Sequence, residues 1–265
     1  MKPTTNSTHT LPGAPSAGAL RAQIYKIETM NRPVPYRIAN ALVNSLIEEH
    51  FRPCTLGRNL VVYCGCGTAD LIIPVLESQP NLSFLGIDVS SDILVEADRE
   101  LSKITNAYSL IELDVLREPG KLMRLPHDFC GDADKNLCVL IRLMAHHFET
   151  SDVARLYAVA REMLSNGGLL VVQEVFGGST YVSDKVCSRI EFEQIAKIED
   201  AIRESLGEKS DLSNAGTFSI AHYEGHKNLR SVFEECDALT AAGFERVDVV
   251  FKHGQIAVIC AEVER

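Results

Sequence analysis

The sequence predicts an α/β fold: a Rossmann-like, seven-stranded sheet with helices on both faces and an antiparallel hairpin at its C-terminal end. Short apolar runs alternate with amphipathic helical stretches over residues 59–175, a pattern typical of parallel strands covered on both faces. A glycine-containing turn follows the first apolar run. The last two apolar runs are joined only by Lys252, His253 and Gly254. A connection that short permits antiparallel pairing and forbids a crossover.

The chain begins with segments that precede the sheet. Residues 1–19 are rich in Thr, Ser, Pro and Gly and lack an apolar core, so we expect a flexible tail rather than a signal peptide. We expect residues 20–265 to form a single domain that opens with N-terminal helices within 20–52. Apolar residues recur there at helical spacing, and Pro33 and Pro35 separate the two helices because proline cannot continue either one.

The alternating region supplies most of the predicted sheet. Strands are expected at 60–63, 84–88, 109–113, 137–141 and 169–175, where the apolar runs are continuous. Helices are expected over 68–78, from a cap at Ser90 or Ser91 to Ile104, and over 151–164.

The alternation stops after residue 175. Residues 180–228 are expected to form a helical lid insertion, with isoleucines along 185–206 that core packing or a dimer contact would also explain. A last helix, ending at Gly243, precedes strands at 246–251 and 255–262. Its apolar face is predicted to carry Leu229, Val232, Phe233, Cys236 and Leu239.

Composition narrows the class of protein. The net charge of -10 would repel nucleic-acid backbones, so nucleic acid is not an expected partner. No apolar run approaches the roughly 18 residues of a membrane-spanning helix, which favours no membrane and a cytoplasmic location. The eight cysteines are scattered, several of them within apolar runs, and are expected to be reduced core residues.

Glycines and carboxylates mark the ends of three successive strands. Gly65 and Gly67 lie where the first strand turns into a helix, a position that allows positive φ and close approach of a ligand. The alternative is a tight turn without a ligand. Asp88 after the second strand can accept both hydroxyls of a ribose, and Asp114 after the third can accept from an exocyclic amine. Together they predict an adenosine-type ligand.

The particular ligand is suggested by residue 70. A dinucleotide fingerprint would need a third glycine there, but the chain has Asp70, which would repel a pyrophosphate. S-adenosylmethionine carries a cationic sulfonium and no phosphate. It is therefore the expected cofactor, with S-adenosylhomocysteine as its product.

The ordered segments VVYCGCGTAD, FLGIDVSSDIL, ELDVL, LMAHHFETSDVARLYAVAREMLSNGGLLVVQEVF and AAGFERVDVVFKHGQIAVICAEV resemble the motifs of class I S-adenosylmethionine-dependent methyltransferases. The resemblance covers about residues 57–176 and 229–263. The segment 32–36 also resembles the entry segment of the carboxy-S-adenosylmethionine synthase branch.

The resemblance implies roles by position. Gly65, Cys66 and Gly67 would cradle the methionine part of the cofactor, and Asp88 with Val89 would hold the ribose. Asp114 would bond the adenine amine while Val115 packs on its ring. Arg142 would face the methionine carboxylate or the substrate. Tyr63 departs from the family, which usually has an acidic residue there to hold the cofactor's amino group; tyrosine brings no charge.

Two histidines follow the fourth strand, His146 and His147. One of them, with His147 as the catalytic candidate beside Arg142, can act as general base for a hydroxyl or amine. The alternative, which we favour, is that the pair opens a helix and packs beneath the site, because methyl transfer needs positioning above all. A metal site built from these histidines with Cys64 and Cys66 is not expected, since the spacing of the four residues fits no usual zinc pattern.

The acceptor is expected to be a small molecule enclosed by the lid. Its candidate contacts are Tyr36, His146, Phe176, Tyr181, His222 and Tyr223. The sequence thus predicts an S-adenosylmethionine-dependent methyltransferase, with a homodimer possible through the unassigned apolar faces. Two alternatives remain: an enzyme similar to carboxy-S-adenosylmethionine synthase, which modifies the cofactor, and a binding scaffold without turnover.

Overall fold

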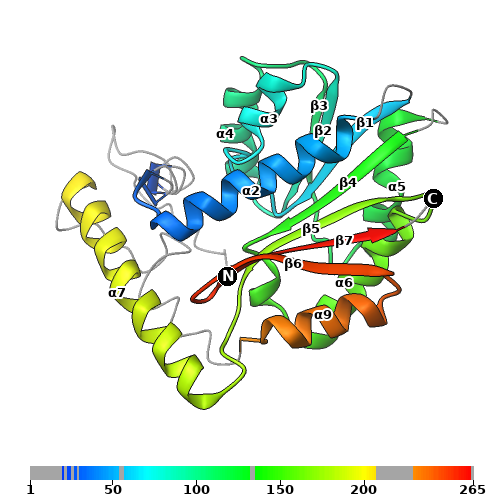
Figure 1. The fold of residues 1–265 in the computed structure, drawn as a ribbon. Coiled ribbons are helices and arrows are strands. Elements are labelled where there is room, and N and C mark those ends of the chain that lie inside the picture. The colour runs from blue at the N-terminus through cyan, green and yellow to red at the C-terminus, as the bar shows by residue number, and fades with distance from the viewer. Residues whose placement is uncertain are drawn as a thin grey trace, which may run out of the picture.

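One seven-stranded sheet organises the chain (Figure 1). The computed structural model describes residues 20, 23–24, 27–28, 30–53, 57–131, 135–206 and 229–263. The strand order is β3-β2-β1-β4-β5-β7-β6. The strands are β1 (Arg58–Cys64), β2 (Leu82–Asp88), β3 (Tyr108–Glu112), β4 (Lys135–Arg142), β5 (Gly168–Val175), β6 (Arg246–His253) and β7 (Ile256–Val263).

The strand pairing confirms the predicted mixed sheet. Strands β1 to β5 run parallel, and β7 pairs antiparallel with both β5 and β6. The order reverses between β1 and β4, so the chain leaves these two neighbours in opposite directions and a crevice can open at their carboxyl ends.

Helices cover both faces of the sheet. The helices are α2 (Val34–Phe51), α3 (Ile73–Ser78), α4 (Ser91–Leu101), α5 (Pro119–Cys130), the short 3-10 helix η1 (Ala145–His147), α6 (Thr150–Met163), α7 (Tyr181–Leu206) and α9 (Val232–Ala241). Buried side chains of α2, α3, α4 and α7 share one hydrophobic core, and those of α5, α6 and α9 share the other. Figure 1 shows α2 crossing in front of the sheet and α7 projecting beside its β6–β7 end.

The helix after the glycine turn begins later than predicted. We expected a helix over 68–78, but α3 begins at Ile73 and residues 68–72 form turns. Ala69 has a φ of 60°, a left-handed conformation that interrupts a helix. Pro74 is confined to the first turn of a helix because it lacks an amide hydrogen. The glycine turn is therefore followed by a short helix of six residues instead of the longer one predicted.

Two further helices differ from the sequence prediction. Helix α5 was not predicted, because Pro119, Gly120 and Pro126 obscure its periodicity. In α9, Phe233 was assigned to the buried face, yet its side chain is 71% exposed. Glu235 lies on the buried face instead, where polar partners satisfy it.

The predicted tail, residues 1–19, and residues 207–228 of the predicted lid insertion lie outside the described residues. The first half of that insertion is helical, as expected. Within the described residues, no helix is both long and apolar enough to cross a membrane.

Gly86 in β2 generates a prediction about packing beneath the glycine turn. A Cβ added there would lie 2.7 Å from Leu110 Cδ2 and 3.0 Å from Cys66 Sγ. Gly86→Ala should lower the free energy of unfolding by about 1–3 kcal/mol through overpacking, measured by urea denaturation. Gly120→Ala is the control, because nothing lies within 4 Å of its added Cβ. It should raise stability by about 0.5 kcal/mol. Equal effects of the two substitutions would contradict this account of the packing.

Candidate functional site

The turn after β1 forms the floor of the candidate site. Gly65, Gly67 and Ala69 have φ values of 68°, 55° and 60°. Three left-handed residues in five fold the chain into a tight bend at the carboxyl end of β1, next to the point where the strand order reverses. Two of these residues are glycines, which adopt this conformation without the steric cost of a side chain.

Cys66 anchors the bend to the sheet. Its amide donates to the Ile87 carbonyl at 2.9 Å, and its side chain is buried. Burial, followed by the nearby Asp88 carboxylate, holds the pKa of the Cys66 thiol well above its ordinary value. The thiol therefore stays protonated and serves packing rather than nucleophilic chemistry.

Asp88 joins the bend to the end of β2. Its Oδ2 accepts from the Gly67 amide and its Oδ1 from the Ser90 amide, each at 3.0 Å. Each carboxylate oxygen can accept a second hydrogen bond. Asp88 is therefore held in place by the backbone and retains an acceptor position on each oxygen for two neighbouring hydroxyls.

The third strand end is more open. Asp114 Oδ1 accepts from the Leu116 amide at 3.0 Å, and its Oδ2 lies 3.2 Å from Nε of the exposed Arg117. The two valines differ: Val89 is 65% exposed beside Asp88, whereas Val115 is buried in the core shared with α5. The structure thus places Asp88 and Asp114 along the same edge of the sheet.

Tyr63 and Arg142 lie together near the carboxyl ends of β1 and β4. The Arg142 guanidinium donates to the Tyr63 hydroxyl at 3.5 Å, to Gln173 Oε1 at 3.0 Å and to Asn40 Oδ1 at 3.2 Å. All of these contacts are with neutral groups from α2, β1 and β5. Sequence reasoning missed Asn40 and Gln173, because neither belongs to a recognisable motif.

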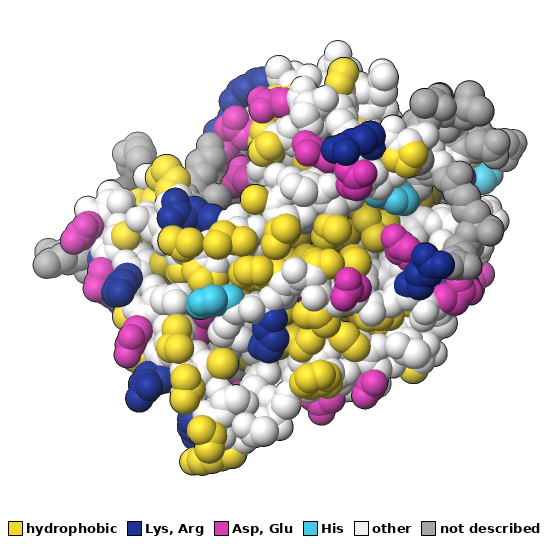
Figure 2. Space-filling view, viewed as in Figure 1, with side chains coloured by type: hydrophobic (Ala, Val, Ile, Leu, Met, Phe, Trp, Pro, Cys, Tyr) yellow, Lys and Arg dark blue, Asp and Glu magenta, His cyan; other side chains and the backbone are white. Residues whose placement is uncertain are grey.

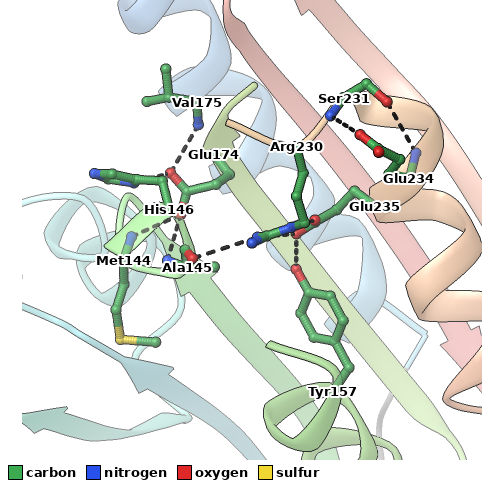
Figure 3. A network of polar contacts seen from close by, with 10 residues as sticks. All are labelled: Met144, Ala145, His146, Tyr157, Glu174, Val175, Arg230, Ser231, Glu234 and Glu235. Carbon is green, nitrogen blue, oxygen red and sulfur yellow. Dashed lines mark hydrogen bonds and ion pairs between the residues drawn. The ribbon is translucent and has the colours of Figure 1, made fainter. Parts of the chain in front are cut away.

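Glu174 is a carboxylate at this edge on which several hydrogen-bond donors converge (Figure 3). It is fully buried in β5. Its Oε2 accepts from the Met144 and Ala145 amides at 2.8 and 2.7 Å, and its Oε1 from the Val175 amide at 2.8 Å. Burial pushes its pKa up, but the opposing influence of His146 and these amides is stronger, so the pKa of Glu174 lies below its ordinary value.

Glu174 also orients His146. The His146 Nδ1 lies 2.5 Å from Glu174 Oε1, and the side chain is only 7% exposed. A carboxylate at Nδ1 favours the tautomer with a proton there and leaves Nε2 as an acceptor. Figure 3 shows His146 beside Glu174, on the turn that also carries Met144 and Ala145. Sequence reasoning missed Glu174, although two adjacent polar residues in an apolar strand are an available signal.

His147 lies beside His146 but is held differently. The two rings have centroids 4.0 Å apart, and His147 is exposed. Both residues are the last two of the 3-10 helix η1, and the next helix, α6, begins at Thr150. Of the two, His146 is the one whose ring is fixed by a buried carboxylate.

Met144 brings the two halves of the site together. A Cβ added to Gly65 would lie 2.8 Å from Met144 Sδ, so the Met144 side chain lies directly against the bend. Met144 also donates its amide to Glu174. The glycine bend and the turn that carries His146 are therefore in direct contact.

The residues predicted to contact the methyl acceptor differ in burial and in position. Tyr36 is buried and donates to Glu191 Oε1 of α7 at 2.5 Å, which ties α7 to α2. Burial is the main cause that raises the pKa of both groups. Phe176 is buried just after β5, whereas Tyr181 is 78% exposed at the start of α7. His222 and Tyr223 lie outside the described residues.

A surface groove lies beside this edge. It encloses about 500 Å³ between α2, α7 and the β6–β7 hairpin and is lined by Asn31, Pro33, Val34, Pro35, Ile38, Gln194, Lys197, Phe251 and His253. Figure 2 shows hydrophobic side chains gathered across this face of the molecule. The groove is open to solvent and contains none of the residues at the glycine bend.

Part of the sequence matches a known domain. Residues 63–170, from β1 to β5, match the methyltransferase domain family. No curated protein sequence matches the chain.

Solved structures share the fold. An O-methyltransferase family protein from Burkholderia thailandensis superimposes with a TM-score of 0.58 at 12% identity, over 93% of this chain and 59% of that one. A Nostoc punctiforme protein assigned as an O-methyltransferase gives 0.54 at 16% identity, over 91% and 60%. The magnesium protoporphyrin IX methyltransferase of Synechocystis, solved with bound S-adenosylmethionine, gives 0.51 at 13% identity, over 96% and 100%. The chain therefore spans about 60% of the length of the first two.

The hydrogen bonds to the Glu174 carboxylate predict that this side chain stabilises the fold in a pH-dependent way. Glu174→Gln should lower the free energy of unfolding by about 3 kcal/mol at pH 7, because an amide cannot accept from all four donors. Because folding lowers the pKa of Glu174, the ionised carboxylate contributes its full stabilisation above the unfolded-state pKa, near 4.5. That stabilisation is lost as the pH falls through the folded-state pKa.

Urea denaturation between pH 7 and pH 3 measures this effect. The stability difference between Glu174→Gln and the wild type should narrow on the acid side. Glu262→Gln on the exposed side of β7 is the control and should be nearly neutral throughout. A difference for Glu174→Gln that stays constant over the whole pH range would contradict the assigned role.

Proposed function

We propose that this chain, which carries a methyltransferase domain of the class I S-adenosylmethionine-dependent type, transfers a methyl group from S-adenosylmethionine to an oxygen or nitrogen atom of a small molecule. The domain match and the shared fold support the methyltransferase assignment. The observation that carries the choice of acceptor atom is His146, fixed by the buried Glu174 beside the glycine bend.

The residues at the sheet edge fit this cofactor. Gly65 and Gly67 adopt left-handed backbone at the carboxyl end of β1, and their backbone groups would hold the methionine part. Asp88 retains one acceptor position on each carboxylate oxygen, which matches the two hydroxyls of a ribose. Asp114, whose Oδ2 pairs with the exposed Arg117, would accept from the adenine amine.

Tyr63 does not exclude the cofactor. It occupies the position where the resemblance implies a carboxylate, and its hydroxyl already accepts from Arg142. Arg142 supplies the positive charge that suits a methionine carboxylate rather than an amino group. We therefore propose that the amino-acid part of the cofactor is held chiefly through its carboxylate, by Arg142 at the end of β4.

The chemistry needs a base when the acceptor atom carries a proton. Bound S-adenosylmethionine supplies a methyl group on a cationic sulfonium. His146 would accept the acceptor's proton at Nε2 while Glu174 stabilises the resulting imidazolium through Nδ1. A new bond from acceptor oxygen or nitrogen to the methyl carbon forms as the sulfur–methyl bond breaks, and S-adenosylhomocysteine leaves as the neutral thioether. Among the two histidines, this assigns the base to His146 rather than to His147.

The acceptor is proposed to be small and to bind against α2 and the end of β5, near the buried Tyr36 and Phe176. Similar structures include O-methyltransferases and a porphyrin methyltransferase, so the fold leaves a range of acceptors open. A homodimer and a cytoplasmic location remain predictions from the sequence.

The role of Asp88 gives a binding prediction. Asp88→Ala should weaken S-adenosylhomocysteine binding by about 2 kcal/mol, measured by calorimetry, because two hydrogen bonds to a charged acceptor are lost. Asp92→Ala is the matched control, since Asp92 is exposed in the first turn of α4. Unchanged affinity in a folded Asp88→Ala protein would remove Asp88 from the cofactor site.

The role of His146 gives a turnover prediction. Wild-type protein with radiolabelled S-adenosylmethionine should methylate at least one member of a panel of phenols, carboxylic acids and amines. His146→Gln should lower that rate by about 100-fold or more, as expected for loss of a general base, and His147→Gln should change it little. Equal losses in both variants would contradict the assignment. Binding of S-adenosylhomocysteine without any turnover would favour a scaffold, and a carboxylated cofactor co-purifying with the protein would favour the synthase-like alternative.

A further inference from the structure

Arg230 connects the two polar clusters on the α9 side of the sheet (Figure 3). It immediately precedes α9, and its carbonyl accepts from the Gly177 amide at 2.9 Å. Gly177 and Ser231 form an isolated parallel bridge. The backbone of Arg230 is thereby attached to the segment that follows β5, at Gly177, three residues beyond the carboxylate that orients His146.

The Arg230 side chain lies between a carboxylate and the His146 turn. Its Nε donates to Glu235 Oε2 at 2.7 Å and its Nη2 to Glu235 Oε1 at 3.4 Å. The same Nη2 lies 3.5 Å from the Ala145 carbonyl, to which it also donates. Glu235 is fully buried and accepts in addition from the Tyr157 hydroxyl of α6. One guanidinium thus links α9 to the turn after β4, and Glu235 extends the cluster to α6.

The Ala145 peptide is held from both ends. Its amide donates to Glu174 Oε2 at 2.7 Å and its carbonyl accepts from Arg230. Ala145 is completely buried, so water cannot replace either partner at low cost. The carbonyl also accepts from the Phe148 amide at 3.1 Å at the end of η1. Loss of the Arg230 contact would therefore remove the bond that ties this carbonyl to the α9 side and would loosen the turn.

We propose that Arg230 is a positioning residue that fixes the Met144–His146 turn, and through it the orientation of His146 toward Glu174. The inference rests on the proposed function for its catalytic consequence, because His146 is the proposed base. The positioning itself is a property of the contacts and can be tested without an acceptor.

The positive charge of Arg230 is balanced by the carboxylate of Glu235. Burial lowers its pKa, but Glu235 and the more distant Tyr157 and Glu174 act in the opposite direction, so the pKa of Arg230 is raised overall and the group stays charged. The planar guanidinium can contact Glu235 and Ala145 at once, whereas an ammonium group is a single point of donation. Lysine at this position would retain the pair with Glu235 and lose the bond to Ala145.

The test compares Arg230→Lys with Tyr157→Phe. Both variants weaken the cluster around Glu235, but only the first removes the contact with Ala145. In Arg230→Lys, the Met144 and Ala145 amides should exchange with deuterium about tenfold faster, as loss of one hydrogen bond to a charged group implies. Nitrogen-15 spectra of histidine-labelled protein should show His146 as a mixture of tautomers instead of the single Nδ1–H form. Tyr157→Phe should retain wild-type exchange and a single tautomer.

The outcomes separate the two claims. Unchanged exchange and an unchanged tautomer in a folded Arg230→Lys protein would overturn the positioning role, as would equal changes in Tyr157→Phe. If the exchange and the tautomer change as expected while wild-type protein methylates none of the panel, the positioning role stands and the proposed methyl transfer fails.

Discussion

The buried carboxylate of Glu174 determines the arrangement of the carboxyl edge. Four donors converge on it: three backbone amides and the His146 ring. A carboxylate inside an apolar strand is costly unless it is satisfied in this way, so the turn after β4 must fold back onto β5. This requirement places η1 at the end of β4 and fixes the ring that the proposed reaction uses.

The same edge is shaped from its other side by the glycine bend. Left-handed backbone at Gly65, Gly67 and Ala69 keeps the chain close to the strand ends, and Asp88 accepts from the bend's own amide. Met144 lies against Gly65 and donates to Glu174, so a ligand in the bend would adjoin the turn that carries His146. The parallel sheet brings these groups together because its strands end at one rim.

The sequence predicted the parts of this arrangement that leave a local pattern. The fold class could be predicted from the continuous apolar strands, the glycines at 65 and 67 and the short connection before β7. The same strands located the carboxylates that follow them. It could not reveal contacts between distant residues, such as Tyr36 with Glu191 or Arg230 with Ala145, because single polar residues carry no periodicity. The late start of α3 was missed because Ala69 adopts a φ of 60° that alanine rarely takes. Phe233 was misplaced because a buried Glu235 replaces the expected apolar contact on α9.

The central claim is that adenosine with a sulfonium tail binds across the bend and the adjoining strand ends. Amide chemical-shift mapping with S-adenosylhomocysteine tests it most directly. The account predicts saturable shifts concentrated at the 65–69 bend, the 88–90 turn and the 144–146 turn, with the opposite edge of the sheet unaffected. Shifts confined to the groove between α2, α7 and the β6–β7 hairpin, or no saturable shifts at all, would contradict it.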